Sequence, residues 1–167
     1  MLGFQNNLSV FVNKSAQYTK SEHYVAGLEY NLTSVSRLTV EGFLKNYSQF
    51  PVSLIDGVSL ANKGGGFEVL GNEAILSLGE GKTSGLEFLF QQKLAKNFYG
   101  ILAYTYFSSK FYGLDGILRP SVWDSRHLIS FSGGYKLKRN WEISARWRYA
   151  GKNPYVPVDI TASTISY

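Results

Sequence analysis

The sequence predicts an all-β fold, an antiparallel up-and-down meander of about 6–7 long strands that forms part of a transmembrane β-barrel. Apolar and polar residues alternate over segments of about ten residues, the period of a strand and not of a helix. Short and long connections between these segments alternate, and aromatic residues gather near both ends of the segments. Transmembrane barrels combine these three features.

The composition of the 167-residue chain excludes several classes of protein. Charged residues make up only 17% and aromatic residues 16%, a balance that favours strands over helices. The net charge of +5 is spread along the chain, without the basic helix or aromatic-basic signature of a nucleic-acid-binding protein. Cysteine is absent, which excludes disulfides and thiolate metal sites. No apolar run reaches the ~18 residues of a membrane-spanning helix, so a membrane role requires strands.

The first hairpin is expected over residues 22–47, after an irregular segment or loop over residues 1–21. Residues 23–32 and 36–47 alternate with period two, and residues 33–35 form the turn between them. Phe43 interrupts the pattern, because it falls on the charged face of its strand.

A long loop is expected over residues 48–81. It holds Pro51, an Asp-Gly pair at 56–57 and three consecutive glycines at 64–66. This density of turn formers breaks regular structure. A connection this long is uncommon in a compact domain unless it is functional or carries its own structure.

The most regular hairpin is predicted over residues 82–111, with a tight turn at 94–97. Its strands run about a dozen residues each, against a usual length of about 5–6. One face of the hairpin is apolar and is assigned to lipid; it carries Leu86, Phe88, Phe90, Leu102 and Tyr104. The other face is small or polar and is assigned to the barrel lumen; it carries Glu87, Gln91 and Thr105.

A third hairpin follows a medium loop over residues 112–122. Its strands are predicted over 123–136 and 141–149, with a tight turn at 137–140 and a further loop over 151–159. The chain therefore reads as a single partial barrel region over 1–167, with strands and loops over 22–158, the start of another strand over 159–167, and no plug domain.

The predicted connections alternate in length without exception. They are short after Leu32, Leu94 and Leu137, and longer after Tyr47, Phe111 and Ala150. All four prolines fall in the longer class. Tight periplasmic turns on one rim and long extracellular loops on the other are typical of transmembrane barrels.

Aromatic residues are predicted to form two belts at the ends of the apolar faces, as at membrane interfaces. The short-turn belt contains Tyr30, Phe98 or Tyr99, Tyr135 and Trp141, and the long-loop belt contains Tyr24, Tyr47, Tyr106, Trp123 and Tyr149. Roughly ten residues at about 3.3 Å, tilted by about 45°, span on the order of 24 Å, close to the apolar thickness of an outer membrane. The inward face is charged, with Arg37, Glu41, Lys45, Glu87, Arg126, Glu142, Arg146 and Arg148.

No motif in the sequence is sufficient to assign a nucleotide-binding or glycosylation site. Gly81-Lys82-Thr83 ends like a phosphate-binding loop, but position 76 is Leu where the motif needs Gly, and a strand follows instead of a helix. The glycines at 64–66 are expected to be a loop apex. The sequons at Asn7, Asn13, Asn31 and Asn46 are too short a pattern to assign glycosylation.

The two histidines and one acid-hydroxyl-base run also give no site. His23 and His127 have no carboxylate at a useful local spacing for a metal. The run from Asp124 to His127 contains Asp, Ser and His, but neighbours on a strand point to opposite faces and cannot form a triad among themselves. We expect no catalytic residue, no metal and no cofactor, and the substrate-binding residues are not identified by sequence.

Several pieces together resemble the barrel region, toward the C-terminus, of TonB-dependent outer-membrane receptors. The resemblance covers residues 22–158 and rests on the order and spacing of short motifs. These are FLKNY (43–47) with Pro51-Val52, LANKG (60–64), GLE (85–87), NFYG (97–100), YTY (104–106), WDSRH (123–127) and RWRY (146–149) with Pro154-Tyr155.

The resemblance implies a barrel of about 22 strands with a plug in its lumen. Such receptors import a siderophore, cobalamin or oligosaccharide across the outer membrane of a Gram-negative bacterium with energy passed through TonB. Implied partners are outer-membrane lipid, the rest of the barrel and plug, TonB through the parent protein, and a small nutrient ligand on loops 48–81, 112–122 and 151–159; nucleic acid is not a partner. The chain lacks a plug, most strands and a signal-peptide pattern. We therefore expect a fragment, with Met1 as an internal methionine.

Two alternatives remain open at this point. One is a complete small outer-membrane barrel of eight strands, an adhesin or lipid-active enzyme, which needs further strands from 1–21 and from Val69–Leu78. The other is a soluble lipocalin-like carrier with an apolar interior and a polar exterior.

Overall fold

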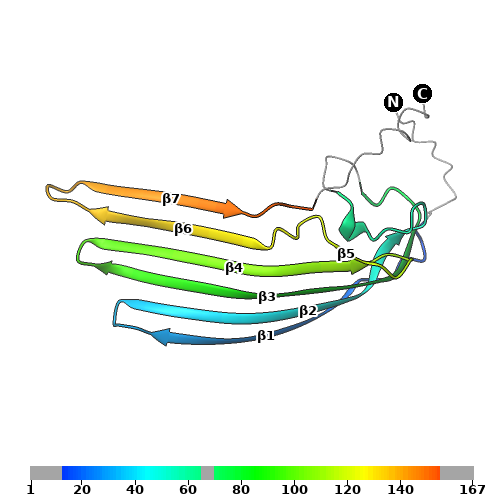
Figure 1. Cartoon of the computed structure of the whole chain (residues 1–167), viewed down its shortest axis with the longest axis horizontal. Helices are drawn as coiled ribbons and strands as arrows, with labels where there is room; N and C mark the ends of the chain where they lie inside the picture. The colour runs from blue at the N-terminus through cyan, green and yellow to red at the C-terminus, as the bar shows by residue number, and fades with distance from the viewer. Residues whose placement is uncertain (1–12, 65–69, 155–167) are drawn as a thin grey trace, which may run out of the picture.

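The computed structural model describes residues 13–64 and 70–154, which form one open antiparallel β-sheet (Figure 1). The strands lie in the order β1-β2-β3-β4-β6-β7, and β5 pairs with β4 outside this path. Their bounds are β1 Lys20–Asn31, β2 Ser36–Ser53, β3 Ile75–Ala95, β4 Phe98–Tyr112, β5 Leu118–Pro120, β6 His127–Lys136 and β7 Glu142–Ala150, with one 3-10 turn, η1, at Leu60–Asn62. The predicted all-β antiparallel meander is confirmed. In these ranges β1 and β7 lie at opposite edges and do not pair with each other, so the sheet is not closed.

The described residues contain no helix long and apolar enough to cross a membrane.

The three predicted tight turns are confirmed, and all lie at the same end of the sheet (Figure 1). Lys96 and Asn97 both have positive φ, as do Arg139 and Asn140. Positive φ at two successive residues is the mark of the hairpin turn whose twist matches that of the strands. In the first turn, the Thr33 hydroxyl accepts hydrogen bonds from the backbone nitrogens of Val35 (3.2 Å) and Ser36 (3.0 Å).

The register of the strands gathers the apolar residues into continuous rows. Each row passes through all six long strands, so the apolar stripes of separate hairpins merge into one face. One row is Leu28, Val40, Phe88, Tyr104, Ile129 and Tyr149, and the next is Tyr30, Leu38, Phe90, Leu102, Phe131 and Trp147. The predicted pairing of faces in the 82–111 hairpin is confirmed, since Glu87 lies opposite Thr105 on the other side of the sheet. We call the two sides the apolar face and the charged face.

Tyr47 and Trp123 do not belong to the apolar face, so these two predictions were wrong. Tyr47 is three residues from Leu44 along β2 and therefore points to the charged face. There its ring lies 5.3 Å from that of Phe111, and Phe50 lies 4.6 Å from Phe111. Trp123 lies in a loop, where its ring meets Phe111 edge-on at 6.3 Å. These aromatic rings cover the loop end of the charged face.

The predicted loop over 48–81 is largely wrong at both ends, because β2 continues to Ser53 and β3 begins at Ile75. Irregular register between Tyr47 and Val52 interrupts the ladder, and Gln49 has a positive φ there. Gly79 and Gly81, which looked like turn formers, lie inside β3. A Cβ at Gly79 would lie 2.6 Å from the Phe50 carbonyl oxygen, so these glycines permit close packing.

Other boundaries shift for similar local reasons. The strand predicted from 123 begins at His127, because residues 121–124 form a turn and Arg126 has a positive φ. Arg126 therefore lies in a loop and not on the charged face. The medium loop contains the unpredicted strand β5. The calls on 159–167, on residues 1–12 and on Gly65-Gly66 lie outside the described residues.

Replacing Gly81 by Ala is expected to destabilise the sheet, because the added Cβ would overlap the ring of buried Phe111. The cost is expected to be about 1–3 kcal/mol in the free energy of unfolding, measured by urea titration in detergent micelles. Glu80→Ala, at the exposed neighbour, is the control and should change little. Adding Phe111→Leu to Gly81→Ala should recover part of the loss. If the losses in the free energy of unfolding of the two single variants simply add in the double variant, Gly81 and Phe111 do not pack against each other as described.

Candidate functional site

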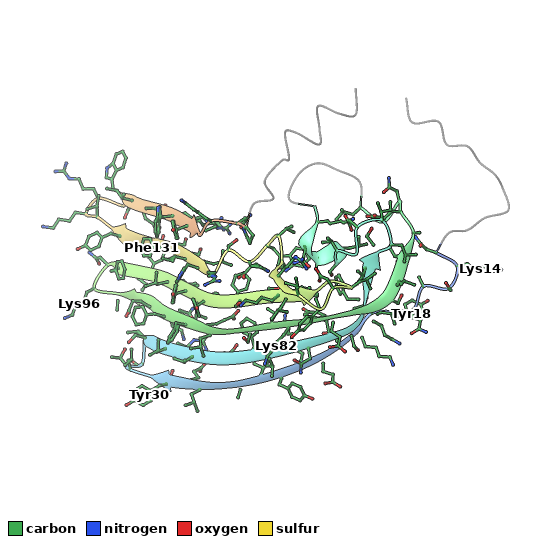
Figure 2. The ribbon with its side chains drawn as sticks, turned by 45° about the vertical axis from the view of Figure 1, so that its right-hand side comes forward. Lys14, Tyr18, Tyr30, Lys82, Lys96 and Phe131 are labelled. Carbon is green, nitrogen blue, oxygen red and sulfur yellow. The ribbon has the colours of Figure 1, made fainter. Side chains whose placement is uncertain are left out.

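The candidate functional site is the group of loops at the end of the sheet opposite the tight turns (Figure 1). It consists of residues 54–64 and 70–74 between β2 and β3, residues 113–126 around β5, and the flanking residues 13–19 and 151–154. We call this group the loop cluster. Figure 2 shows Lys14 and Tyr18 at this end and Tyr30 and Lys96 at the opposite end.

The two main loops are joined to each other by hydrogen bonds. The Leu114 nitrogen donates to the Gly57 oxygen (2.8 Å), and the Val122 nitrogen donates to the Ala61 oxygen (3.1 Å). The Asn62 side-chain nitrogen donates to the carbonyl oxygens of Arg119 (3.0 Å) and Pro120 (2.7 Å). Segments that are about sixty residues apart in sequence therefore form one folded unit.

The flanking segments are fixed to the same unit. The Asn13 side chain donates to the Glu73 carbonyl oxygen (2.9 Å) and accepts from the Ile75 nitrogen (3.0 Å). At the other flank, the Gly151 nitrogen donates to the His127 carbonyl oxygen (2.8 Å).

Lys63 links both sides of the loop between β2 and β3. Its Nζ lies 2.8 Å from Asp56 Oδ2 and 2.9 Å from Glu73 Oε1, and the Ser53 hydroxyl donates to Glu73. We call these four residues the lysine clasp. Glu73 and Lys63 are mostly buried, whereas Asp56 is half exposed.

The clasp shifts the pKa of each charged member toward its charged form. For Lys63, burial opposes the charge, but hydrogen bonds to Asp56 and Glu73 outweigh it and raise the pKa. For Asp56, burial also opposes the charge, and the bonds from Lys63 and the Val58 nitrogen lower its pKa below the ordinary value. The hydrogen bond from Ser53, followed by that from Lys63, lowers the pKa of Glu73. Each group stabilises the charge of its neighbour.

The second loop has its own ion pair, on the surface. Arg119 donates to both oxygens of Asp115, at 2.9 and 2.6 Å, and the Ile117 nitrogen donates to the same carboxylate (3.0 Å). The hydrogen bond from Arg119 is the main cause that lowers the pKa of Asp115 to about 2. This pair holds the turn at Gly116, whose φ is +70°.

The loop cluster covers the only fully buried part of the described chain. Val52, Ala61 and Phe111 are its buried apolar side chains, surrounded by Ser53, Ser59, Ser109 and Ser121. The Thr83 and Ser109 hydroxyls share a 2.8 Å hydrogen bond across β3 and β4. The underside of the loops is therefore packed against the charged face.

Some buried oxygen atoms in this region have no hydrogen-bond partner. They are Asn62 Oδ1, Ser121 Oγ and both carboxylate oxygens of Asp124. Sequence reasoning noticed Asp124 only as part of a rejected triad. This residue is only 2% exposed, and no local sequence pattern predicts that burial.

The motifs rejected on sequence lie apart from one another. Gly81-Lys82-Thr83 lies inside β3, paired with β4. His23 lies opposite Lys45 on the charged face, whereas His127 lies opposite Tyr106 on the apolar face with its Nδ1 2.9 Å from the Tyr104 hydroxyl. The Ser125 hydroxyl donates to Asn153. In the described residues no group of three or more His, Cys, Asp or Glu side chains could hold a metal ion.

A broad depression lies on the apolar face, away from the loop cluster. It has a volume of about 690 Å³. Small residues at its centre, Ala26, Gly42, Ser84 and Ser108, leave a gap between the larger side chains of Tyr24, Leu86 and Tyr106.

Comparison with known proteins finds no family model that matches the chain and no curated protein that matches it.

Replacing Lys63 by Met is expected to open the lysine clasp, because two carboxylates would then face each other without a cation. Leaving Glu73 without its cation should cost about 1–3 kcal/mol in the free energy of unfolding and should speed proteolytic cleavage within residues 54–74. Lys82→Met, at an exposed lysine in β3, is the control. Equal cleavage rates in the two variants would contradict the role of the clasp.

The same clasp should make the loop sensitive to acid. The pKa values of Asp56 and Glu73 are lowered in the folded loop, so these two carboxylates stabilise the fold fully when the pH is above their ordinary pKa values of 3.8 and 4.5. That stabilisation is lost as the pH falls through their lowered pKa values. The raised pKa of Lys63 preserves the clasp up to its ordinary value of 10.5 and beyond. In the unsubstituted chain, cleavage of this loop should therefore rise only in acid below about pH 4 and in strong alkali. In the Lys63→Met variant, the cleavage rate should lose most of this pH dependence.

Proposed function

We propose that this sheet is a section of a transmembrane β-barrel in the outer membrane of a Gram-negative bacterium. The observation that carries the proposal is the apolar face, which runs without interruption through six strands. Its side chains are uncovered: Leu28 is 80% exposed and Ile143 63%. An exposed apolar surface of this extent calls for another apolar phase, and lipid provides one.

The charged face suits a lumen that contains water. Glu41 and Glu87 lie directly opposite each other on β2 and β3, and like charges in this position repel. Water screens that repulsion, whereas an apolar interior would strengthen it. Arg37 lies nearby, with its guanidinium 3.0 Å from the Glu29 carboxylate.

The two ends of the sheet differ as the two rims of such a barrel do. The tight turns at 32–35, 96–97 and 137–141 would lie at the periplasmic rim. The loop cluster at the other end would lie outside the cell, where it would contribute to ligand capture.

The open edges support a barrel that is larger than the described sheet. β1 and β7 each leave one side of the backbone without a partner strand in the described residues. Unpaired backbone groups are costly in lipid, so a β-sheet can span a membrane only when its strands form a closed ring. We propose that further strands of a parent barrel pair with β1 and β7.

The parent is proposed to be a TonB-dependent receptor that imports a siderophore, cobalamin or oligosaccharide. This step rests on the resemblance of the ordered motifs over residues 22–158. The parent would supply a plug, the contact with TonB and the remaining strands. The role of this section would be binding and transport, with no reaction catalysed.

Replacing Phe88 by Arg tests the membrane proposal. Phe88 lies in the middle of the apolar face, where a charge would enter the lipid. The expected cost is about 2–4 kcal/mol in the free energy of folding the complete barrel that contains this sheet into phospholipid vesicles. Glu87→Arg, at the adjacent residue on the other face, is the matched control and should be nearly neutral. The measurement is urea-dependent folding followed by tryptophan fluorescence.

Two results would contradict the membrane proposal. One is an equal cost for Phe88→Arg and Glu87→Arg in vesicles. The other is recovery of the unsubstituted 167-residue chain as a folded monomer in buffer without detergent, which would favour a soluble carrier.

The DNA upstream of the Met1 codon tests the receptor proposal separately. An in-frame region that encodes a plug-like domain after a signal peptide is the expected result. A stop codon directly upstream, with no plug-coding sequence behind it, would overturn the receptor proposal and favour a small complete barrel.

A further inference from the structure

The loop cluster contains a group of buried oxygen atoms with no hydrogen-bond partner among the described residues. Both carboxylate oxygens of Asp124, the Ser121 hydroxyl and Asn62 Oδ1 have no hydrogen-bond partner. The exposed fractions of these residues are 2%, 0% and 8%. Buried polar groups nearly always have partners, so a concentration of unsatisfied acceptors at one place indicates a missing ligand.

The three residues belong to one crossing of the two loops. Asn62 donates to the carbonyl oxygens of Arg119 and Pro120, directly before Ser121. The Asp124 nitrogen donates to the Ser121 oxygen (3.0 Å), which closes a turn. These hydrogen bonds place the three residues at the same crossing of the loops.

The orientation of the Asn62 amide is fixed by its partners. Two carbonyl oxygens lie within hydrogen-bond distance of its nitrogen, and a carbonyl can only accept. The amide nitrogen must therefore face them, and Oδ1 stays available as an acceptor.

The charge of Asp124 is not balanced by a neighbouring cation. Lys63 pairs with Asp56 and Glu73, and Arg119 pairs with Asp115. None of the ion pairs of the described residues includes Asp124. A buried carboxylate without a countercharge is strongly unfavourable.

We infer that Asn62, Ser121 and Asp124 bind a divalent cation of the calcium class. A carboxylate, an amide oxygen and a hydroxyl are hard oxygen donors, the kind that Ca²⁺ takes, and Ca²⁺ accepts irregular geometry with waters or backbone carbonyls as further ligands. A water molecule could satisfy the hydrogen bonds but would leave the carboxylate charge uncompensated. The site would join the two loops by a link that the hydrogen bonds do not provide.

This site does not depend on the membrane proposal. With one carboxylate, the affinity should be modest, with a dissociation constant on the order of 0.1–1 mM, the range of extracellular calcium modules. The cation would stabilise the loop cluster only where calcium is plentiful.

The test compares thermal unfolding of the full chain, refolded in detergent micelles, in 10 mM CaCl₂ (roughly ten or more times the expected dissociation constant) and in EDTA. Calcium should raise the melting midpoint of the unsubstituted chain by roughly 4 °C, and the rise should saturate as the calcium concentration increases. MgCl₂ at the same concentration should raise the midpoint by less. Asp124→Asn keeps the size of the side chain and removes its charge. This variant should show no calcium shift, and in EDTA it should melt at or above the parent because the unbalanced charge is gone.

Two further variants separate binding from a general loss of structure. Ser121→Ala removes one proposed ligand and should weaken calcium binding by about tenfold while the far-ultraviolet circular dichroism stays unchanged. Asp115→Asn removes an exposed carboxylate in the same loop and should keep the full calcium shift. No calcium shift in the parent, or an undiminished shift in Asp124→Asn, would overturn the inference.

Discussion

The cross-strand register is the constraint on which the rest of the structure depends. Because side chains alternate with period two, a slip of one residue in any pair would move its apolar side chains to the charged face. The row from Leu28 to Tyr149 exists only because each of its five pairings keeps the same parity. At the Lys96-Asn97 turn, a register shift between Gln92 and Ala95 is also needed for that parity. The pair next to the turn is Ala95 with Phe98, one residue out of step with the ladder that pairs Gln92 with Gly100.

At the loop end of the sheet, the structure depends on close packing of aromatic rings against glycines and less on the alternation of apolar and polar residues. The charged face becomes aromatic near the loops, where the rings of Tyr47, Phe50 and Phe111 make tilted and edge-on contacts beside glycines of β3. The absence of a side chain at Gly81 leaves room for the Phe111 ring. The loops then close over this cluster, so the buried apolar side chains of the described residues lie at the end where the proposed ligand would arrive.

The two faces and two ends together support one physical picture. An uncovered apolar surface, opposed carboxylates on the other side and unpaired edge strands would each be a liability for an isolated protein in water. All of them become acceptable in a closed barrel with lipid outside and water within. The loop cluster would add a preformed surface, because the lysine clasp and the hydrogen bonds between the loops fix its shape before a ligand binds.

The sequence by itself determined the strands, the tight turns and the two faces, because these depend on residues close together in the chain. Residues 82–111 needed no tertiary information, since Phe88 and Glu87 already alternate. Only the tertiary structure decided the rest. The sequence suggests that Gly79 and Gly81 form turns. In the structure they lie inside β3, where the absence of a side chain lets Phe50 and Phe111 pack closely against them. The hydrogen bonds from Asn62 to the carbonyl oxygens of Arg119 and Pro120 likewise join two loops about sixty residues apart, and local patterns carry no record of such contacts.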